Sequence, residues 1–239
     1  MNSLVESLKE AGFLHIKNIA QRAFSSPLQK KLFSSWWGDL VPDENFKEYT
    51  SRARRILRYS LSGHTPSTLT INRNSSYSSA AKYEIAYKEG VNNLTYCEEG
   101  FISDPILQAV LLFDLELCRS FIGQGKSIEL DIHQFRIKSE AGAISPTTSG
   151  IHQDEYDMVF MHFVRSQNIL PVISEVFSHP DEDALLFRKE MTGFLETLVI
   201  DDRQCWHRAS AVRQKALGAP AWRDMLIVSC RKSAWEAPL

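Results

Sequence analysis

The sequence predicts a mainly β protein, a jelly-roll barrel covered by a layer of α-helices. After residue 125 the chain consists of short strand-like runs separated by loops, with no long helix between them. The first of these runs, residues 127–137, alternates polar and apolar side chains as a strand with one buried face does. The clearest helix, residues 104–121, precedes them. Strands that follow one another without helices are typical of an antiparallel barrel or sandwich.

The first half of the chain predicts three helices and one strand. A short helix is indicated over residues 4–11, where Gly12 ends it, and residues 13–16 have the composition of a strand. Residues 27–37 form the next helix, opened by a proline whose missing N–H is harmless in a first turn. Asp104 can cap the third helix, whose apolar residues nearly encircle it, so we expect this helix to be buried against the sheet.

An arginine-rich run occupies residues 51–62, with Arg52, Arg54, Arg55 and Arg58 between apolar residues. The run is either a basic surface that contacts an anion or a solvated face on which the arginine stems cover apolar neighbours. The solvated face is the favoured interpretation, because arginine stems commonly cover apolar surface in this way.

Further strands are expected over residues 157–164, 169–177, 193–200, 204–209 and 223–230. The whole chain, residues 1–239, is expected to form a single domain. In that domain, residues 1–125 would supply the helical and loop cover with supporting elements. Residues 126–239 would supply the jelly-roll core and the site.

The composition limits the class of partner. The net charge is −2, from 27 basic and 29 acidic residues, so bulk electrostatics indicate neither a nucleic-acid nor a membrane partner. The N-terminus has no signal-peptide pattern, and no apolar run reaches the roughly 20 residues that span a bilayer. The four cysteines form no Cys-x-x-Cys pair. We therefore expect a cytoplasmic protein with reduced thiols, and the sequence leaves a homodimer open because nothing in it determines the oligomeric state.

The run His152-Gln153-Asp154, together with His207, predicts a metal centre. Side chains alternate along a strand, so a His-x-Asp pair in an extended segment places both groups on one face. One further imidazole from a neighbouring strand, that of His207, would complete three ligands on one side of an ion and leave its other positions open. Two histidines and one carboxylate in this arrangement are typical of non-haem Fe(II) oxygenases.

Arg223 begins the last expected strand and is predicted to lie on a strand antiparallel to that of His207. A guanidinium can hold a planar carboxylate through two parallel hydrogen bonds. An inward-facing Arg223 near the metal therefore suggests an anionic co-substrate. Arg231, on the same strand and with the same parity, is the alternative.

Three blocks of sequence resemble those of a known family. They are residues 133–137, residues 150–154 continuing to 165–169, and residues 195–203 continuing through His207 to 223–226. On these blocks the chain from His133 to Cys230 resembles the bacterial 2-oxoglutarate/Fe(II)-dependent dioxygenases that include L-isoleucine dioxygenase, a hydroxylase of free amino acids. The resemblance implies Fe(II), 2-oxoglutarate as co-substrate and O2 as oxidant.

The resemblance also implies roles for individual residues. His152, Asp154 and His207 would be the iron ligands, and Arg223 would pair with the distal carboxylate of 2-oxoglutarate. Gln134 shares one face of its strand with residue 136. Either both side chains bind 2-oxoglutarate or the substrate carboxylate from inside the barrel, or both lie on an exposed edge face.

The substrate that the resemblance implies is a small zwitterion, above all a free aliphatic L-amino acid. Its carboxylate needs a cation, for which Arg136 and Arg165 are the candidates. Its ammonium needs an acceptor, for which Glu155 and Asp157 are the candidates, because a buried unpaired charge is costly.

Two departures from the family pattern concern the substrate. Gln153 and Glu155 flank Asp154 where the family often has a basic residue and a glycine, and Leu170-Pro171 stands where glycines are expected. The same chemistry on another small molecule, or on an amino acid tethered to a carrier protein, therefore stays an alternative. A non-catalytic metal- or ligand-binding β-barrel is the second alternative, from which Fe(II)- and 2-oxoglutarate-dependent succinate formation would distinguish an enzyme.

Overall fold

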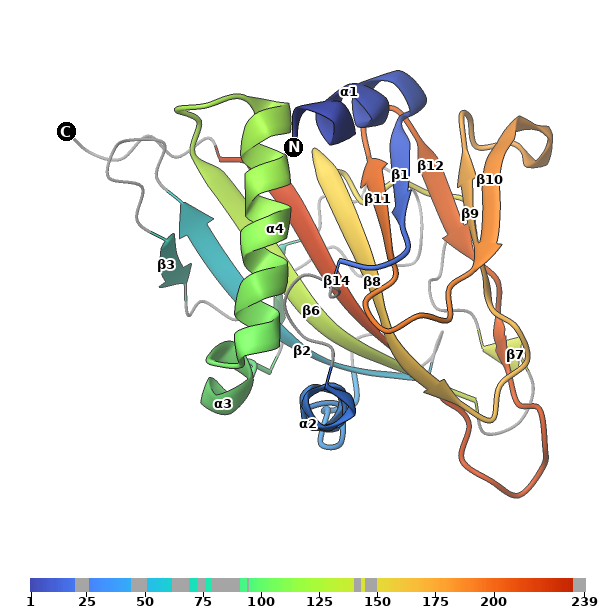
Figure 1. Cartoon of the computed structure of the whole chain (residues 1–239). Coiled ribbons are helices and arrows are strands. Elements are labelled where there is room, and N and C mark those ends of the chain that lie inside the picture. The colour runs from blue at the N-terminus through green and yellow to red at the C-terminus, as the bar shows by residue number, and fades with distance from the viewer. Residues whose placement is uncertain are drawn as a thin grey trace.

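The computed structural model of the chain (Figure 1) describes residues 1–19, 26–43, 51–61, 69–72, 76–78, 91–93, 95–139, 143–144 and 150–233. The α-helices of these residues are α1 (Asn2–Ala11), α2 (Pro27–Ser35), α3 (Glu99–Ile102) and α4 (Pro105–Ile122). The expected helices are thus confirmed as α1, α2 and α4. No helix in the described ranges is both long enough and apolar enough to cross a membrane.

A seven-stranded sheet, ordered β1-β11-β8-β14-β6-β2-β3, forms the centre of the molecule. Its strands are β1 (Phe13–Ile16), β2 (Arg52–Leu61), β3 (Leu69–Asn72), β6 (Ile128–Lys138), β8 (Met158–Gln167), β11 (Thr197–Asp201) and β14 (Trp222–Lys232). All neighbouring pairs in this sheet are antiparallel. The first half of the chain therefore contributes strands to the large sheet as well as helical cover.

A smaller sheet, ordered β10-β9-β12, consists of β9 (Ile173–Phe177), β10 (Leu185–Glu190) and β12 (Trp206–Ala209). Two short pairs join β4 (Ser76–Ser78) to β5 (Val91–Asn93) and β7 (Ala143–Ile144) to β13 (Val212–Arg213). The expectation that the strands of Arg223 and His207 are neighbours is wrong. The strand of Arg223, β14, lies between β6 and β8 of the large sheet, whereas β12 pairs with β9 in the small one.

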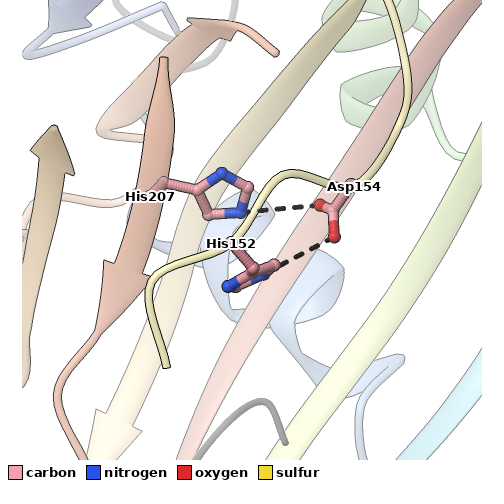
Figure 2. Close-up of side chains that lie close together, drawn as sticks. All are labelled: His152, Asp154 and His207. Carbon is pink, nitrogen blue, oxygen red and sulfur yellow. Dashed lines mark ion pairs between the residues drawn. The ribbon is translucent and has the colours of Figure 1, made fainter. Parts of the chain in front are cut away.

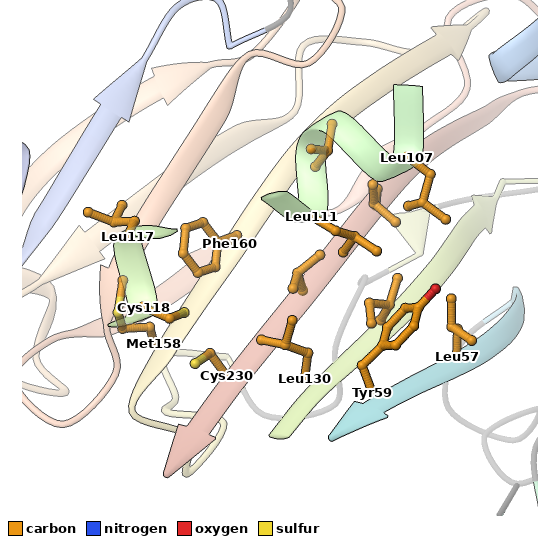
Figure 3. Close-up of a cluster of buried hydrophobic side chains, with 14 of the residues drawn as sticks. Leu57, Tyr59, Leu107, Leu111, Leu117, Cys118, Leu130, Met158, Phe160 and Cys230 are labelled. Atoms are coloured by element: carbon orange, nitrogen blue, oxygen red, sulfur yellow. The ribbon is translucent and has the colours of Figure 1, made fainter. Parts of the chain in front are cut away.

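Helix α4 covers the outer face of the large sheet (Figure 1), where the main hydrophobic core lies. Side chains of α4 meet side chains of β2, β6, β8 and β14 there, among them Leu57, Tyr59, Leu107, Leu111, Leu117, Cys118, Leu130, Met158, Phe160 and Cys230 (Figure 3). The helix begins as its sequence predicts, because the Asp104 carboxylate accepts the backbone N–H of Ile106 at 2.8 Å.

A second hydrophobic cluster lies between the two sheets and defines the inner face of the large sheet. Phe163, Leu198 and Met225 come from the large sheet, and Val176 comes from the small one. Phe13 of β1 and Phe187 of β10 pack against them with their ring centroids 5.2 Å apart. The two sheets therefore stack face to face.

The arginine-rich run forms β2, and the favoured interpretation as a solvated face is wrong. Arg52, Arg54 and Arg58 are only 9%, 5% and 8% exposed. They alternate with the core residues Leu57 and Tyr59, so the arginines point to the inner face while the apolar residues point to α4. Charged groups at such depth need partners, and acidic side chains contact all three arginines.

Candidate metal centre

A short antiparallel bridge brings His152 beside His207. The backbone N–H of His152 donates to the carbonyl of His207 at 3.0 Å, and the reverse hydrogen bond measures 2.8 Å. Asp154 approaches both rings, with Oδ1 3.5 Å from Nε2 of His152 and Oδ2 3.5 Å from Nε2 of His207 (Figure 2). One ligand atom from each residue lies within 4.8 Å of the other two. The structure thus brings together the three side chains that the sequence singles out.

The centre faces the space between the sheets. His207 lies opposite Val176 in the register of β12 with β9, and Val176 belongs to the cluster between the sheets. Both histidines are buried, whereas 37% of the Asp154 side chain is exposed. The three ligand atoms therefore converge in the interior, and solvent reaches them on the side of the carboxylate.

Asp202, buried in the turn between β11 and β12, holds the loop that carries Asp154. Its Oδ1 accepts the backbone N–H of Asp154 at 3.1 Å, and its Oδ2 accepts that of Tyr156 at 3.0 Å. The same Oδ1 lies 3.7 Å from Nδ1 of His207, which has no hydrogen-bond partner among the described residues. A carboxylate behind a histidine commonly orients that ring toward a metal. In the sequence, the adjacent residues Asp201 and Asp202 indicate only a turn.

The charge states of His152 and Asp154 suit a divalent cation. Burial, and then the nearby His207, lowers the pKa of His152, so its ring is neutral and able to bind a metal. Burial opposes ionisation of Asp154, but the hydrogen bond and the charge of His207 hold the pKa of Asp154 below its usual range. Burial likewise opposes protonation of His207, yet its contact with Asp154 raises its pKa. One carboxylate and two imidazoles are the donor set of a non-haem iron site.

Arg223 is a buried cation with no ion-pair partner in the described part of the chain. It is 4% exposed, and its Nη2 has no hydrogen-bond partner among the described residues. Burial lowers the pKa of this guanidinium to about 10, against the weaker opposing influence of Glu190. Alternation along β14 places Arg223 on the inner face with Met225, and its guanidinium lies 6.0 Å from the ring centroid of Phe163. Such a group requires an anion.

Arg231, the alternative to Arg223, already has a partner. Its Nε lies 2.8 Å from the Glu129 carboxylate, and 42% of its side chain is exposed. An exposed, paired arginine gains little from a further anion. Of the two arginines on β14, Arg223 is therefore the one whose surroundings call for a carboxylate ligand.

The structure does not bring Gln134, Arg136 and Arg165 to the triad. Arg136 binds the Asp224 carboxylate at 2.7 and 2.6 Å, and Nε of Arg165 lies 3.1 Å from the same group. Asp224 follows Arg223 directly on β14, so the two side chains point to opposite faces. Gln134 shares the face of Arg136 and donates to a backbone carbonyl just after α2 at 3.3 Å. The side chains of these three residues therefore make their contacts on the outer face of the large sheet and not at the metal centre.

The two candidate acceptors for an ammonium group lie directly after the triad. Glu155 is exposed in a turn, with a left-handed φ of 64°. Asp157 is engaged, because its carboxylate lies 3.1 Å from Arg203 and accepts the backbone N–H of Lys232 at 2.6 Å. Of the two, Glu155 lies on the solvent side of Asp154.

A second charged cluster lies on the inner face, and the sequence indicated its arginines but not their acidic partner. Arg52 and Arg54 of β2 share this face with His133 of β6, and Asp43 lies against both arginines. Alternation shows that the two arginines share a face, but it does not show that this face is the inner one. Nothing in the local sequence marks Asp43 as their partner.

Comparison with known sequences finds one family and a curated relative. Residues 34–229 match the sequence model of a family described as 2OG-Fe dioxygenase. L-isoleucine-4-hydroxylase from Bacillus thuringiensis is 24% identical over 234 residues, which cover 94% of this chain and 92% of the relative.

Solved structures share the fold. The crystal structure of IDO from Bacillus thuringiensis superposes with a TM-score of 0.80 at 18% identity, covering 97% of this chain and 94% of that one. A bsmA homologue from Methylobium petroleophilum PM1 has a TM-score of 0.83 at 23% identity, covering 100% of this chain and 95% of that one. These likenesses confirm the mainly β, jelly-roll class that the sequence predicts.

Proposed function

This chain belongs to the 2OG-Fe dioxygenase family, which its residues 34–229 match, and on that premise we propose that it hydroxylates a free aliphatic L-amino acid. The protein is a dioxygenase, and its family uses Fe(II), 2-oxoglutarate and O2. The products of the proposed reaction are the hydroxylated amino acid, succinate and CO2.

The observation that carries the proposal is the convergence of His152, Asp154 and His207, whose ligand atoms lie within 4.8 Å of one another. In our proposal these side chains bind Fe(II) from one side. Bound there, Fe(II) supplies O2 activation, in which 2-oxoglutarate takes one oxygen atom and loses CO2 to give succinate, while a substrate C–H bond becomes C–OH with the other. Asp202 keeps the Asp154 loop and the His207 ring in place.

Arg223 is the residue that we assign to 2-oxoglutarate. Its buried guanidinium, with Nη2 lacking a partner among the described residues, would pair with the distal carboxylate of the co-substrate. That pairing would remove the cost of burying an isolated cation. Because Arg223 points into the space that His207 also faces, one co-substrate would contact the arginine and the metal.

The substrate class is supported by the relative and by the charge of the chain. The relative that aligns with 94% of this chain is by name an L-isoleucine-4-hydroxylase, which makes free aliphatic amino acids the first class to test. The net charge of −2 gives no long-range attraction for a polyanion.

The test is a screen of the twenty free L-amino acids with Fe(II), ascorbate, 2-oxoglutarate and O2. We expect at least one aliphatic amino acid to gain the mass of one oxygen, with succinate formed in step. Oxidation of a carrier-tethered amino acid or another small molecule, with no free amino acid oxidised, would refute the substrate class but keep the dioxygenase. The His152→Ala variant is the control for metal-independent background.

A further inference from the structure

Two buried arginines on β2 point into the space between the sheets. Arg52 and Arg54 are opposite Ile137 and Phe135 in the register of β2 with β6, and their guanidinium groups lie 5.3 and 5.6 Å from the Phe135 ring centroid. Phe135 in turn stacks on His133, with ring centroids 5.4 Å apart. The aromatic ring therefore supports both guanidinium groups from one side and limits the directions in which they can point.

Asp43 is the acidic partner of both arginines, and only half of its carboxylate is used. Its Oδ2 lies 2.7 Å from Nε of Arg52 and 2.6 Å from Nε of Arg54. Its Oδ1 is buried and accepts no hydrogen bond from any described residue, although Asp43 is only 3% exposed. The backbone N–H of Asp43 donates to the carbonyl of Arg52 at 2.9 Å, so the residue is fixed to β2. A buried carboxylate oxygen needs a donor, which a water molecule, an ion or a bound ligand can supply.

The cluster and the metal centre face the same space between the two sheets. His133 is on the strand next to β2, one inner-face position away from Phe135. After burial, the positive charge of Arg54 is the main influence that lowers the pKa of His133. A molecule held by the arginines would therefore lie in the space that His207 also faces.

The cluster is separate from the place assigned to 2-oxoglutarate. Arg52 pairs with Ile137 across β2 and β6, and Ile137 pairs with Arg223 across β6 and β14. Neighbouring strands lie about 4.8 Å apart, so the backbones at Arg52 and Arg223 are two strand spacings, or about 10 Å, apart on one face. The Arg52 guanidinium lies at the ring of Phe135, whereas that of Arg223 lies at the ring of Phe163. The inner face thus offers two separate cationic positions, enough for two different carboxylates.

We infer that Arg52, Arg54 and Asp43 form the subsite for the charged head of an α-amino acid substrate, the carboxylate on the arginines and the ammonium on Oδ1 of Asp43. The inference rests on the proposed function. A planar guanidinium binds a carboxylate through a pair of parallel N–H groups, and Arg52 and Arg54 place two guanidinium groups at the ring of Phe135. One oxygen of Asp43 would hold the arginines in place while the other received the ammonium, so the cluster matches both charges of a zwitterion.

The experiment measures amino-acid binding by calorimetry to the anaerobic Fe(II)·2-oxoglutarate enzyme. The probes are L-isoleucine, L-isoleucinamide, which lacks the carboxylate, and 3-methylpentanoate, which lacks the ammonium. If the screen finds a better substrate than isoleucine, that amino acid and its two analogues take their place. The wild type should prefer the zwitterion over both analogues.

The two variants should lose opposite preferences. Arg54→Gln should lower the affinity for L-isoleucine by about tenfold or more, because a charge-assisted hydrogen bond is lost. This variant should also bind L-isoleucinamide as well as it binds L-isoleucine. Asp43→Asn should no longer discriminate against 3-methylpentanoate. Arg54→Lys keeps the charge but lacks the paired N–H groups of a guanidinium, so it should also lower the affinity for L-isoleucine. This variant replaces Arg54→Gln in the experiment if Arg54→Gln does not fold. The affinity for 2-oxoglutarate should stay at the wild-type value in all of them.

Arg165→Gln is the matched control, because Arg165 contacts Asp224 on the outer face. The affinity of this variant for L-isoleucine should equal that of the wild type. Wild-type isoleucine affinity in both Arg54→Gln and Asp43→Asn, or its loss in Arg165→Gln alone, would overturn the inference while the proposed function stands. A wild-type enzyme that binds and oxidises no free amino acid would overturn the proposed substrate class and this subsite with it.

Discussion

Replacing Asp202 by asparagine tests two roles of this carboxylate separately. One is to position the metal ligands, and the other is to stabilise the fold. Asp202 contacts both segments that carry the triad. It accepts the backbone N–H groups of Asp154 and Tyr156 at 3.1 and 3.0 Å, and it lies 3.7 Å from Nδ1 of His207. An amide has one acceptor where the carboxylate has two. In the variant, one backbone N–H would face an NH2 group, and Nδ1 of His207 would lose the negative charge behind it.

The expected effect on metal binding is large. Removing the outer partner of a metal ligand typically costs about 10- to 100-fold in metal affinity. We therefore expect the Kd of Fe(II) for Asp202→Asn to rise by about that factor. The affinity for 2-oxoglutarate, measured at saturating metal, should change much less, because Asp202 has no described contact with Arg223.

The effect on the stability of the metal-free protein should depend on pH. Burial, and then the charge of Asp154, raises the pKa of Asp202 to about 7. A carboxyl whose pKa is higher in the folded chain than in the unfolded chain stabilises the fold fully below its unfolded pKa and loses that contribution as pH rises through about 7. Asparagine does not titrate, so the free energy of unfolding of the wild type relative to Asp202→Asn should fall between about pH 4 and about pH 7 and stay level above that.

The assay combines anaerobic Fe(II) titration with urea unfolding of the metal-free protein at several pH values. Asp201→Asn is the control, since the neighbouring Asp201 contacts Arg203 at 3.3 Å and has no described side-chain contact with the triad. Unchanged Fe(II) affinity in Asp202→Asn, or an equal loss in Asp201→Asn, would refute the reasoning. A constant stability difference across the pH range would show that Asp202 does not titrate as its surroundings indicate.

Three further predictions concern the triad, the co-substrate and the core. His152→Ala should abolish Fe(II) binding and turnover while the circular dichroism spectrum stays that of the wild type, and full activity would exclude this residue as a ligand. Arg223→Lys keeps the charge but loses the fork, so binding of 2-oxoglutarate should weaken by about 1.5–3 kcal/mol in calorimetry, and an unchanged Kd would assign the carboxylate to another cation. Leu111→Ala, in the core under α4, should lower the free energy of unfolding by about 2–5 kcal/mol in urea, and a loss well below about 1 kcal/mol would contradict its burial.

The elements that the sequence predicts correctly are those with local causes. Gly12 ends α1 with a left-handed φ of 77°, a conformation that glycine adopts without strain. Asp104 caps α4, and the alternation in residues 127–137 becomes β6. The strand order has no local cause. No local sequence pattern indicates that β14 lies between β6 and β8 or that β12 belongs to a different sheet. The neighbour predicted for Arg223 was wrong for that reason.

The metal triad could be predicted because its signal is mostly local. His152 and Asp154 are two residues apart, and the donor types alone restrict the chemistry. Asp202 was missed because its role depends on a turn that folds back on the Asp154 loop, 48 residues earlier in the chain. A carboxylate that accepts backbone N–H groups from a loop distant in the sequence has no local sequence signature, so only the three-dimensional contacts identify it.

The arginines show what separates a correct from an incorrect prediction in a sheet. Alternation correctly groups Gln134 with Arg136, and Arg52 with Arg54, but it leaves open which group faces the interior. Two long-range strand pairings settle the question for all of them. Because Arg223 pairs with Ile137, which pairs with Arg52, these three positions share the inner face, and Gln134 and Arg136 must point to the helices. The pairings of β6 with β14 and with β2 together therefore favour β2 over Arg136 as the source of the cation for the substrate carboxylate.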